Sequence, residues 1–357
     1  MKKLLLVVLM VSILPEFARA DEKMDFVSDK PKSVLESKKK KKAKYGWDGL
    51  LKTSGSISWA HSDNVMGQTD GATWNIGYIL NGKLAYLSKK GHEWSNNLNW
   101  QLNYLKTPLL DEFAKGMDNF EISSAYLFHI PDYEWMGPFA QLGLKTAIMD
   151  GYYLAATPMN VEYRNPKGEP IETVAFATQE RIDLTKFFSP LVIKQSLGYF
   201  LKPLTKKQAK VFIQAGGGAW EIFGRNGWAV RDDAATTDTL EVQKIEDTFQ
   251  VGAELSVGIE GVIRKNFNYE LKANLLYPFY HNSETDMTGM DLLNMDFEVK
   301  AGLKLNKYVS INYSFKAVKM PLVSEEWQIQ NGVVLSFNMT LLEPKKPKKK
   351  KKEEKKK

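Results

Sequence analysis

The residues best suited to chemistry in this 357-residue chain are its four histidines, because cysteine is absent. Two of them have a serine close by: His61 is followed directly by Ser62, and Ser283 lies two positions after His281. Side chains two apart share one face of a strand, so only the second pair has the spacing of a hydrolase base and nucleophile. The alternative is that these are polar loop residues. We favour it, because the sequence offers neither an orienting third group nor an oxyanion site.

Metal and phosphate chemistry have little support. His92 and His129 have no carboxylate or histidine neighbour at ligand spacing, and the absence of cysteine excludes thiolate sites and disulfides. The Gly216-Gly217-Gly218 run lacks the Lys-Ser/Thr of a phosphate-binding loop and instead predicts a bulge or sharp bend in a β segment. Acidic segments could bridge divalent cations to lipopolysaccharide, but none has the spacing of an EF-hand. We therefore expect no catalytic, cofactor-binding or metal-binding residues and no cofactor.

The chain begins with an export signal. Lys2 and Lys3 precede an apolar run at residues 4–14, and Ala18-Arg19-Ala20 matches a signal-peptidase site. Residues 1–20 are thus predicted to be a signal peptide, and the polar, Lys-rich residues 21–46 a disordered linker. Residues 343–357 are predicted to be a second Lys-rich disordered tail.

The net charge of +7 comes from these two ends. Of the 49 Lys and Arg and 42 Asp and Glu, residues 1–45 hold 12 and 6 and residues 344–357 hold 10 and 2, which leaves 27 and 34 for the body. An acidic body argues against nucleic-acid binding, which uses a basic stripe on the folded domain. The basic tails favour contact with an anionic envelope component such as peptidoglycan, or serve only as solvated extensions.

The body alternates apolar and polar residues with a period of two, as strands with one apolar face do. Between Trp94 and Tyr104, for example, Leu98 and Trp100 alternate with Asn99 and Gln101. The mean hydropathy of −0.35 and the absence of a later long apolar run argue against a helical membrane bundle. Twelve such segments are predicted as strands, at about 51–59, 73–87, 94–104, 120–130, 138–149, 191–202, 209–222, 249–260, 267–277, 297–305, 311–316 and 327–339.

The connections distinguish a membrane barrel from a soluble β-sandwich. Gaps after even-numbered segments are short, whereas most gaps after odd-numbered ones are longer, reaching about forty residues at 150–190. Short periplasmic turns alternating with long external loops are typical of outer-membrane barrels. We therefore predict an all-β, transmembrane, antiparallel up-and-down barrel of about 12 strands at residues 47–342, in the outer membrane of a Gram-negative bacterium. Its interfacial girdles are predicted from aromatic residues near strand ends: Trp59, Trp74, Tyr86, Trp94, Tyr104, Tyr277, Phe279 and Trp327.

The predicted inward face mixes both charges, which favours a narrow or occluded lumen over a strongly ion-selective pore. Its acids are Glu254, Glu260, Glu270 and Glu298, and its bases are Lys83, Lys272, Lys300, Lys304 and Lys316.

Several short motifs resemble a known family. Trp47-Asp48-Gly49, the segment 98–104 (LNWQLNY) and the segments 187–190 (FFSP) and 196–203 (SLGYFLKP) resemble the uncharacterised outer-membrane β-barrel family of Bacteroidetes, a domain of unknown function. The resemblance covers about residues 46–342 and implies no activity. The last strand also resembles the signal read by barrel assembly machinery, through Gln330, Gly332, Leu335 and Phe337.

These features predict a non-catalytic outer-membrane protein, with a small-solute channel restricted by the 150–190 loop as the leading role. That loop is expected to form a short helix or an inward-folded strand near residues 177–188. The alternatives are an envelope-tethering protein using its Lys-rich periplasmic tails, and an outer-membrane hydrolase. Expected partners are outer-membrane lipid, lipopolysaccharide and the barrel assembly machinery, with peptidoglycan through the tails and no nucleic acid. The oligomeric state and the solute are left open.

Overall fold

The computed structural model describes residues 45–63, 70–206, 208–231, 236, 239–264, 266–283, 285–306, 308–322 and 324–342. The predicted signal peptide, nearly all of the linker and the C-terminal tail lie outside the described residues. No helix within the described ranges is long and apolar enough to cross a membrane.

Twelve antiparallel strands close into one barrel, in the order β1-β18-β17-β16-β15-β14-β11-β10-β5-β4-β3-β2 and back to β1. This confirms the predicted fold class and strand number. The barrel strands are β1 (Gly46–Ser62), β2 (Gly71–Leu87), β3 (His92–Lys106), β4 (Ala114–Phe128), β5 (Met136–Thr146), β10 (Leu191–Thr205), β11 (Lys210–Phe223), β14 (Thr248–Ile263), β15 (Phe267–His281), β16 (Asn294–Lys304), β17 (Val309–Met320) and β18 (Ser324–Leu342).

The barrel is polar inside and apolar outside. Leu197 and Val333 point outward and are 70% and 69% exposed, whereas Asn99 and Lys300 point inward and are 5% and 8% exposed. Such an inversion is stable only where lipid surrounds the outer face, so the alternation that the sequence shows is that of a transmembrane barrel. It confirms the expected location in the outer membrane.

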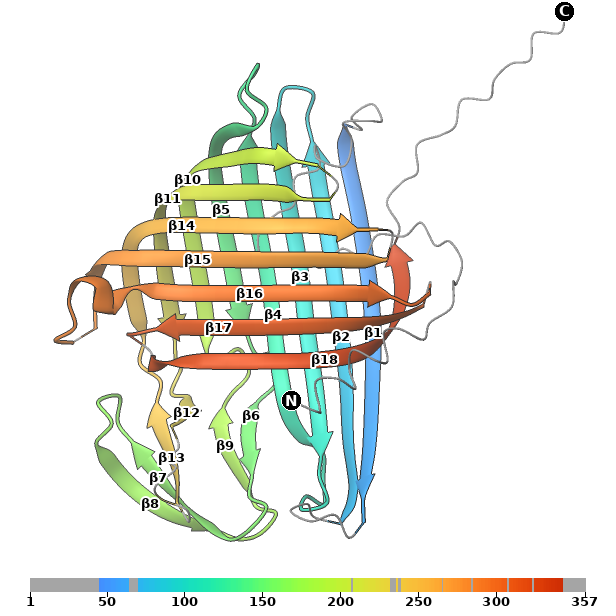
Figure 1. Ribbon diagram of the computed structural model, residues 1–357. Helices are drawn as coiled ribbons and strands as arrows, with labels where there is room; N and C mark the ends of the chain where they lie inside the picture. The colour runs from blue at the N-terminus through green and yellow to red at the C-terminus, as the bar shows by residue number, and fades with distance from the viewer. Residues whose placement is uncertain are drawn as a thin grey trace, which may run out of the picture.

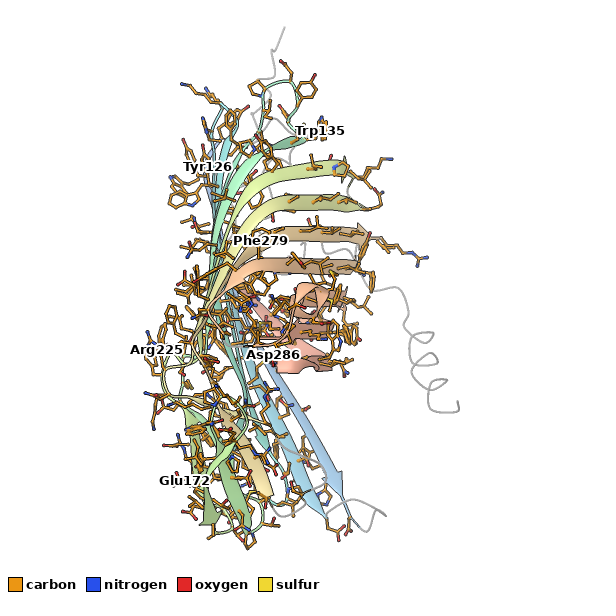
Figure 2. All side chains as sticks on the ribbon, turned by 90° about the vertical axis from the view of Figure 1, so that its left-hand side faces the viewer. Tyr126, Trp135, Glu172, Arg225, Phe279 and Asp286 are labelled. Carbon is orange, nitrogen blue, oxygen red and sulfur yellow. The ribbon has the colours of Figure 1, made fainter. Side chains whose placement is uncertain are left out.

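Both ends of the barrel chain lie at the short-turn end. Gly46 pairs with Leu87 beside the turn at 88–91, and the end of β18 pairs with β1 near the same rim. An aromatic row crosses four strands there, because Trp47, Tyr86, Trp94 and Tyr126 are successive partners in register. Figure 2 shows Tyr126 and Trp135 at one end of the molecule and Glu172, in the long loops, at the other.

Most strands are longer than the 9–11 residues that are needed to cross a bilayer at a tilt, and they range from 11 residues in β5 and β16 to 19 in β18. In Figure 1, β1 to β4 extend beyond the front wall towards the loop strands. One of the connections that follow an odd-numbered barrel strand is short. Only residues 321–323 join the eleventh barrel strand, β17, to the twelfth, β18.

The barrel has two walls whose strands cross in Figure 1, with β1 to β5 behind and β14 to β18 in front. Strong tilt of the strands in a closed barrel produces this crossing. β10 and β11 curve from one wall to the other (Figure 2), and inward-facing glycines lie along the bend. A Cβ on Gly216 would lie 2.0 Å from the carbonyl oxygen of Leu197. Of the two predicted alternatives, the bend is present and the bulge is not, because the register is continuous through Gly216, Gly217 and Gly218.

The two longest loops form a second β unit beyond the barrel end (Figure 1, lower left). One sheet pairs β6 (Gly151–Leu154) with β9 (Arg181–Thr185), and the other has the order β12-β13-β7-β8. The strands of the second sheet are β7 (Met159–Arg164), β8 (Pro170–Phe176), β12 (Trp228–Val230) and β13 (Thr239–Lys244). Val161, Ile182 and Val242 are fully buried in the core that these strands share. We call this unit the loop sandwich.

The loop sandwich decides between two expected alternatives. Residues 181–185 form a strand, β9, rather than a short helix, and β9 pairs with β6. The loop also pairs with its neighbour at 224–247, which was not predicted. β13 pairs in parallel with β7 and so joins the two loops. Each loop gains from the other a neighbouring strand that it does not have by itself. A 3-10 turn, η2 (Gly289–Leu292), lies in the loop between β15 and β16.

Candidate functional site

The candidate site is a polar cavity of about 90 Å³ in the barrel interior. A cavity of this size holds several water molecules. Its charged lining comes from six strands: Glu121 on β4, Lys145 on β5, Lys194 on β10, Glu254 on β14, Asp296 on β16 and Lys316 on β17. Amides of Asn97, Asn99, Gln141 and Asn274 complete the polar surface.

Opposite charges meet across this cavity. The ammonium group of Lys194 lies 3.9 Å from a carboxylate oxygen of Asp296, although three strands separate β10 from β16 around the wall. The same ammonium lies 3.8 Å from the centre of the Trp220 ring. On the rear wall, Lys145 lies 3.5 Å from Glu121, its neighbour in register. A side chain from the bend therefore reaches one on the front wall across the lumen, which narrows it.

Glu254 makes a second link across the strand bend. Its carboxylate accepts a hydrogen bond of 2.5 Å from the hydroxyl of Ser196, passing over β11. Gly218 makes room for this contact, because a Cβ there would lie 2.5 Å from Oε2 of Glu254. The glycine run thus serves the lumen as well as the bend.

A ladder of ion pairs lines the front wall. Lys272 lies 3.3 Å from Glu270 and 3.1 Å from Glu298, and Lys300 lies 2.5 Å from Glu298. All four side chains are at least nine-tenths buried in the interior. The mixed charges predicted for the inward face therefore pair along the wall, in keeping with the expected narrow lumen.

At the short-turn end, the interior is packed around a buried histidine. Nε2 of His129 lies 2.9 Å from a carboxylate oxygen of Glu93, and Nδ1 lies 2.7 Å from the carbonyl oxygen of Glu134. A carbonyl only accepts, so Nδ1 donates, and a second proton must then lie between Nε2 and Glu93. Lys202 lies 3.9 Å from the same carboxylate, and the ring of Phe200 packs edge-on against His129.

An apolar cluster surrounds these charges. Leu127 and Phe200 are fully buried in it and Phe139 nearly so, and Phe212 packs against them. These inward-facing residues are apolar, whereas those around the cavity are polar. Their packing fills the interior at this end of the barrel, beside the rear wall.

The sequence missed the Glu93–His129 contact because the two residues are 36 positions apart. Only the register of β3 against β4 brings them together. The sequence indicated only that both side chains lie on the polar, inward face, because each takes a polar position in the alternation of its own segment.

The structure does not assemble the hydrolase pair. Nδ1 of His281 meets the backbone carbonyl of Ser283, at 3.1 Å, rather than its hydroxyl. His61 stacks on Trp59, with ring centroids 6.1 Å apart. Within the described part of the chain, no group of three His, Asp or Glu side chains could hold a metal ion.

The predicted girdle residues are exposed on the outside, with one exception. Tyr104 is half-buried and donates a hydrogen bond to the sulfur of Met149, at 3.2 Å. Trp59 and Trp74 pack together near the outer end, with centroids 6.0 Å apart. Leu98 and Trp100 face outward and Asn99 faces the cavity, as predicted.

No family model matches the chain, and no curated protein matches it. Solved structures with a similar fold include an outer-membrane channel from Pseudomonas putida F1, at 10% identity and a TM-score of 0.37, covering 83% of this chain and 96% of that one. The translocator domain of the autotransporter NalP from Neisseria meningitidis has 8% identity and a TM-score of 0.34, with 83% and 90% covered. The NanC porin has 8% identity and a TM-score of 0.32, with 81% and 98% covered. These scores are too low to transfer any property from those proteins.

Proposed function

We propose that this protein is a non-catalytic outer-membrane barrel that passes small polar solutes through a narrow lumen. The observation that carries the proposal is the polar cavity at mid-barrel, lined by amides and by charges of both signs from facing walls. A lining with both donors and acceptors replaces the hydration of a small polar solute better than an apolar core would.

In this proposal, side chains of the barrel strands, and not the loops, narrow the lumen. None of the described residues that line the cavity comes from the loop sandwich, whereas Lys194 and Asp296 bridge the lumen. The sandwich contacts the outer end of β4, where the hydroxyl of Tyr152 on β6 donates to the backbone carbonyl of Phe113 at 3.2 Å. We therefore assign the sandwich to the entrance, and restriction by the 150–190 loop stays a prediction.

Single-channel recording in a planar bilayer tests the proposal. The wild-type protein is expected to show small conductance steps, and the double variant Lys194→Ala with Asp296→Ala to show steps several-fold larger, since both bridging side chains are gone. Lys186→Ala, on the exposed surface of the loop sandwich, removes a similar charge and is the matched control. Refolded, heat-modifiable protein without any conductance would refute the channel.

A second role, attachment to an anionic envelope polymer such as peptidoglycan, is supported by the short-turn end. The first and last described residues, Tyr45 and Leu342, lie near this rim, where Lys89, Lys90, Lys206 and Arg264 are exposed on the turns. Deleting residues 344–357 should reduce co-sedimentation with peptidoglycan, and unchanged sedimentation would count against tethering. Kinship with the Bacteroidetes family and contacts with lipopolysaccharide and the assembly machinery stay predictions.

A further inference from the structure

The loop sandwich has an open strand edge. Its larger sheet ends in β8, which pairs with β7 on one side and, among the described residues, with no strand on the other. In Figure 1, β8 is the outermost strand of the unit, at the lower left. β8 has seven residues, and the other strands of the unit have three to six. The longest strand of the loop sandwich therefore lies at an edge that no described strand covers.

Most of this edge lacks the usual protection against the addition of a strand. Natural edge strands are protected by prolines, lysines, bulges or short length. Pro170 and a bulge at Ile171 protect the start of β8, but residues 172–176 continue in register with β7 and contain neither proline nor lysine. All residues from 170 to 175 are exposed. Because alternate backbone groups of an edge strand point away from its one neighbour, residues 172–176 can pair with a further strand.

The edge is both acidic and apolar. Glu172 and Val174 lie on the face that carries Tyr163 and Val161, because residues in register share a face. Val174 is 37% exposed although its partner Val161 is fully buried, so the open side of Val174 faces the edge. Glu172 makes no ion pair with another described residue. Burial of the Tyr163 ring and then the negative charge of Glu172 raise the pKa of Tyr163, so this charge acts at the edge.

The charge around the edge makes a second copy of this chain a poor occupant. Residues 150–190 and 224–247, which form the loop sandwich, hold six acids each, against four and three bases. Pairing of β8 with itself about Thr173 would also bring two Glu172 side chains diagonally across one face, where like charges repel. A basic strand would instead place a cation beside Glu172.

We propose that the edge of β8 binds an extended basic peptide of another protein, which adds to the sheet as a further strand. The peptide backbone pairs with residues 172–176 and supplies the affinity, and its alternate side chains supply the selectivity. A lysine or arginine lies beside Glu172, and an apolar residue on the same face covers Val174. The edge lies beyond the end of the barrel, so its binding does not depend on the channel proposal.

Fluorescence anisotropy with the full-length protein in detergent micelles measures the binding of a labelled probe peptide, acetyl-Val-Lys-Thr-Val-Thr-Lys-Val-amide. Its two lysines and central valine share one face of the extended chain. The same peptide with glutamate in place of both lysines should bind several-fold more weakly. Equal binding of the acidic peptide would overturn the preference for a basic partner.

A charge reversal at the edge locates the site. Glu172→Lys should reverse the preference between the two peptides. Glu112→Lys makes the same change on the exposed loop between β3 and β4 and should leave the preference unchanged. An equal loss of lysine-peptide binding in both variants would show that net charge rather than the edge selects the peptide, and would overturn the site.

Backbone pairing is tested by N-methylation of every amide of the lysine peptide. This change keeps both charges but removes the donors of a strand ladder, so binding should fall to the level of the acidic peptide. Hydrogen exchange at residues 172–176 should slow several-fold when the unmethylated peptide is bound, whereas exchange in β9 should not change. Undiminished binding of the methylated peptide, or unchanged exchange at residues 172–176 under saturating peptide, would overturn strand addition.

A second copy at the edge is detected with single cysteines, because the chain has no cysteine of its own. Thr173→Cys and Glu112→Cys each place one thiol at an exposed position. Both variants should form disulfide-linked dimers at similar, slow rates under mild oxidation. Much faster dimerisation of Thr173→Cys would show that β8 pairs with β8 of another copy, and would overturn the proposal of a basic peptide.

Discussion

Replacing Leu98 by arginine places a charge on the lipid face of β3, near the middle of a strand that spans residues 92–106. Its neighbours in register are Gly82 on β2 and Ile122 on β4, neither of which could pair with the new charge. An arginine at the bilayer midplane of a barrel costs about 2–4 kcal/mol. That is roughly a 30- to 700-fold loss in the folding equilibrium, since about 1.4 kcal/mol corresponds to ten-fold.

Asn99→Arg is the matched variant on the next residue. Its side chain would enter the polar cavity beside Glu121, its partner in register, so the desolvation cost is offset by a nearby carboxylate. We expect less than half of the penalty found at Leu98.

Reversible urea unfolding in lipid vesicles, followed by heat-modifiable gel mobility, measures both free energies. Similar penalties at Leu98 and Asn99, or a larger one at Asn99, would mean that the facing of β3 is wrong and that the inside-out burial of the barrel is misassigned.

Four further outcomes are expected. The mature chain should begin at Asp21 and fractionate with outer membranes, and recovery as a soluble periplasmic protein would contradict the fold. Gly137→Ala should abolish the heat-modifiable barrel because its Cβ would lie 1.8 Å from the carbonyl oxygen of Phe128, whereas Gly258→Ala, with contacts no closer than 4.0 Å, should fold normally. His129→Ala should cost about 3–5 kcal/mol of unfolding free energy, because it removes the imidazole that lies 2.9 Å from the buried carboxylate of Glu93, while His281→Ala should cost little. The hydrogen bond from Lys186 holds the pKa of Asp183 below its usual range. The ion pair therefore adds a little to the stability of the loop sandwich above the ordinary pKa of an aspartate, and this contribution is lost as the pH falls through the lowered pKa of Asp183. Lys186→Met should raise the pKa of Asp183 in an NMR titration, and an unchanged pKa would contradict the pairing.

The strands and their faces were predictable because a barrel wall repeats one local rule. Each residue of β3 lies on one side or the other according to its parity, so Leu98 and Asn99 could be placed without knowing which strands lie beside them. Loop lengths then supplied the orientation. The strand lengths were underestimated because bilayer thickness limits only the lipid-facing part, and nothing in the alternation marks where the lipid ends.

Contacts between distant residues were decided by the tertiary structure. Lys194 reaches Asp296 only because the strand bend brings β10 towards β16, and His129 meets Glu93 only through the register of β3 and β4. The loop sandwich needs two loops about eighty residues apart, joined by β7 and β13, and neither loop alone shows its partner. The same holds for the closure of the barrel: the sequence of β18 predicts a strand, but nothing in it marks the residues that pair with β1. Alternation is a local consequence of backbone geometry, whereas register and closure depend on the free energy of all the strands together.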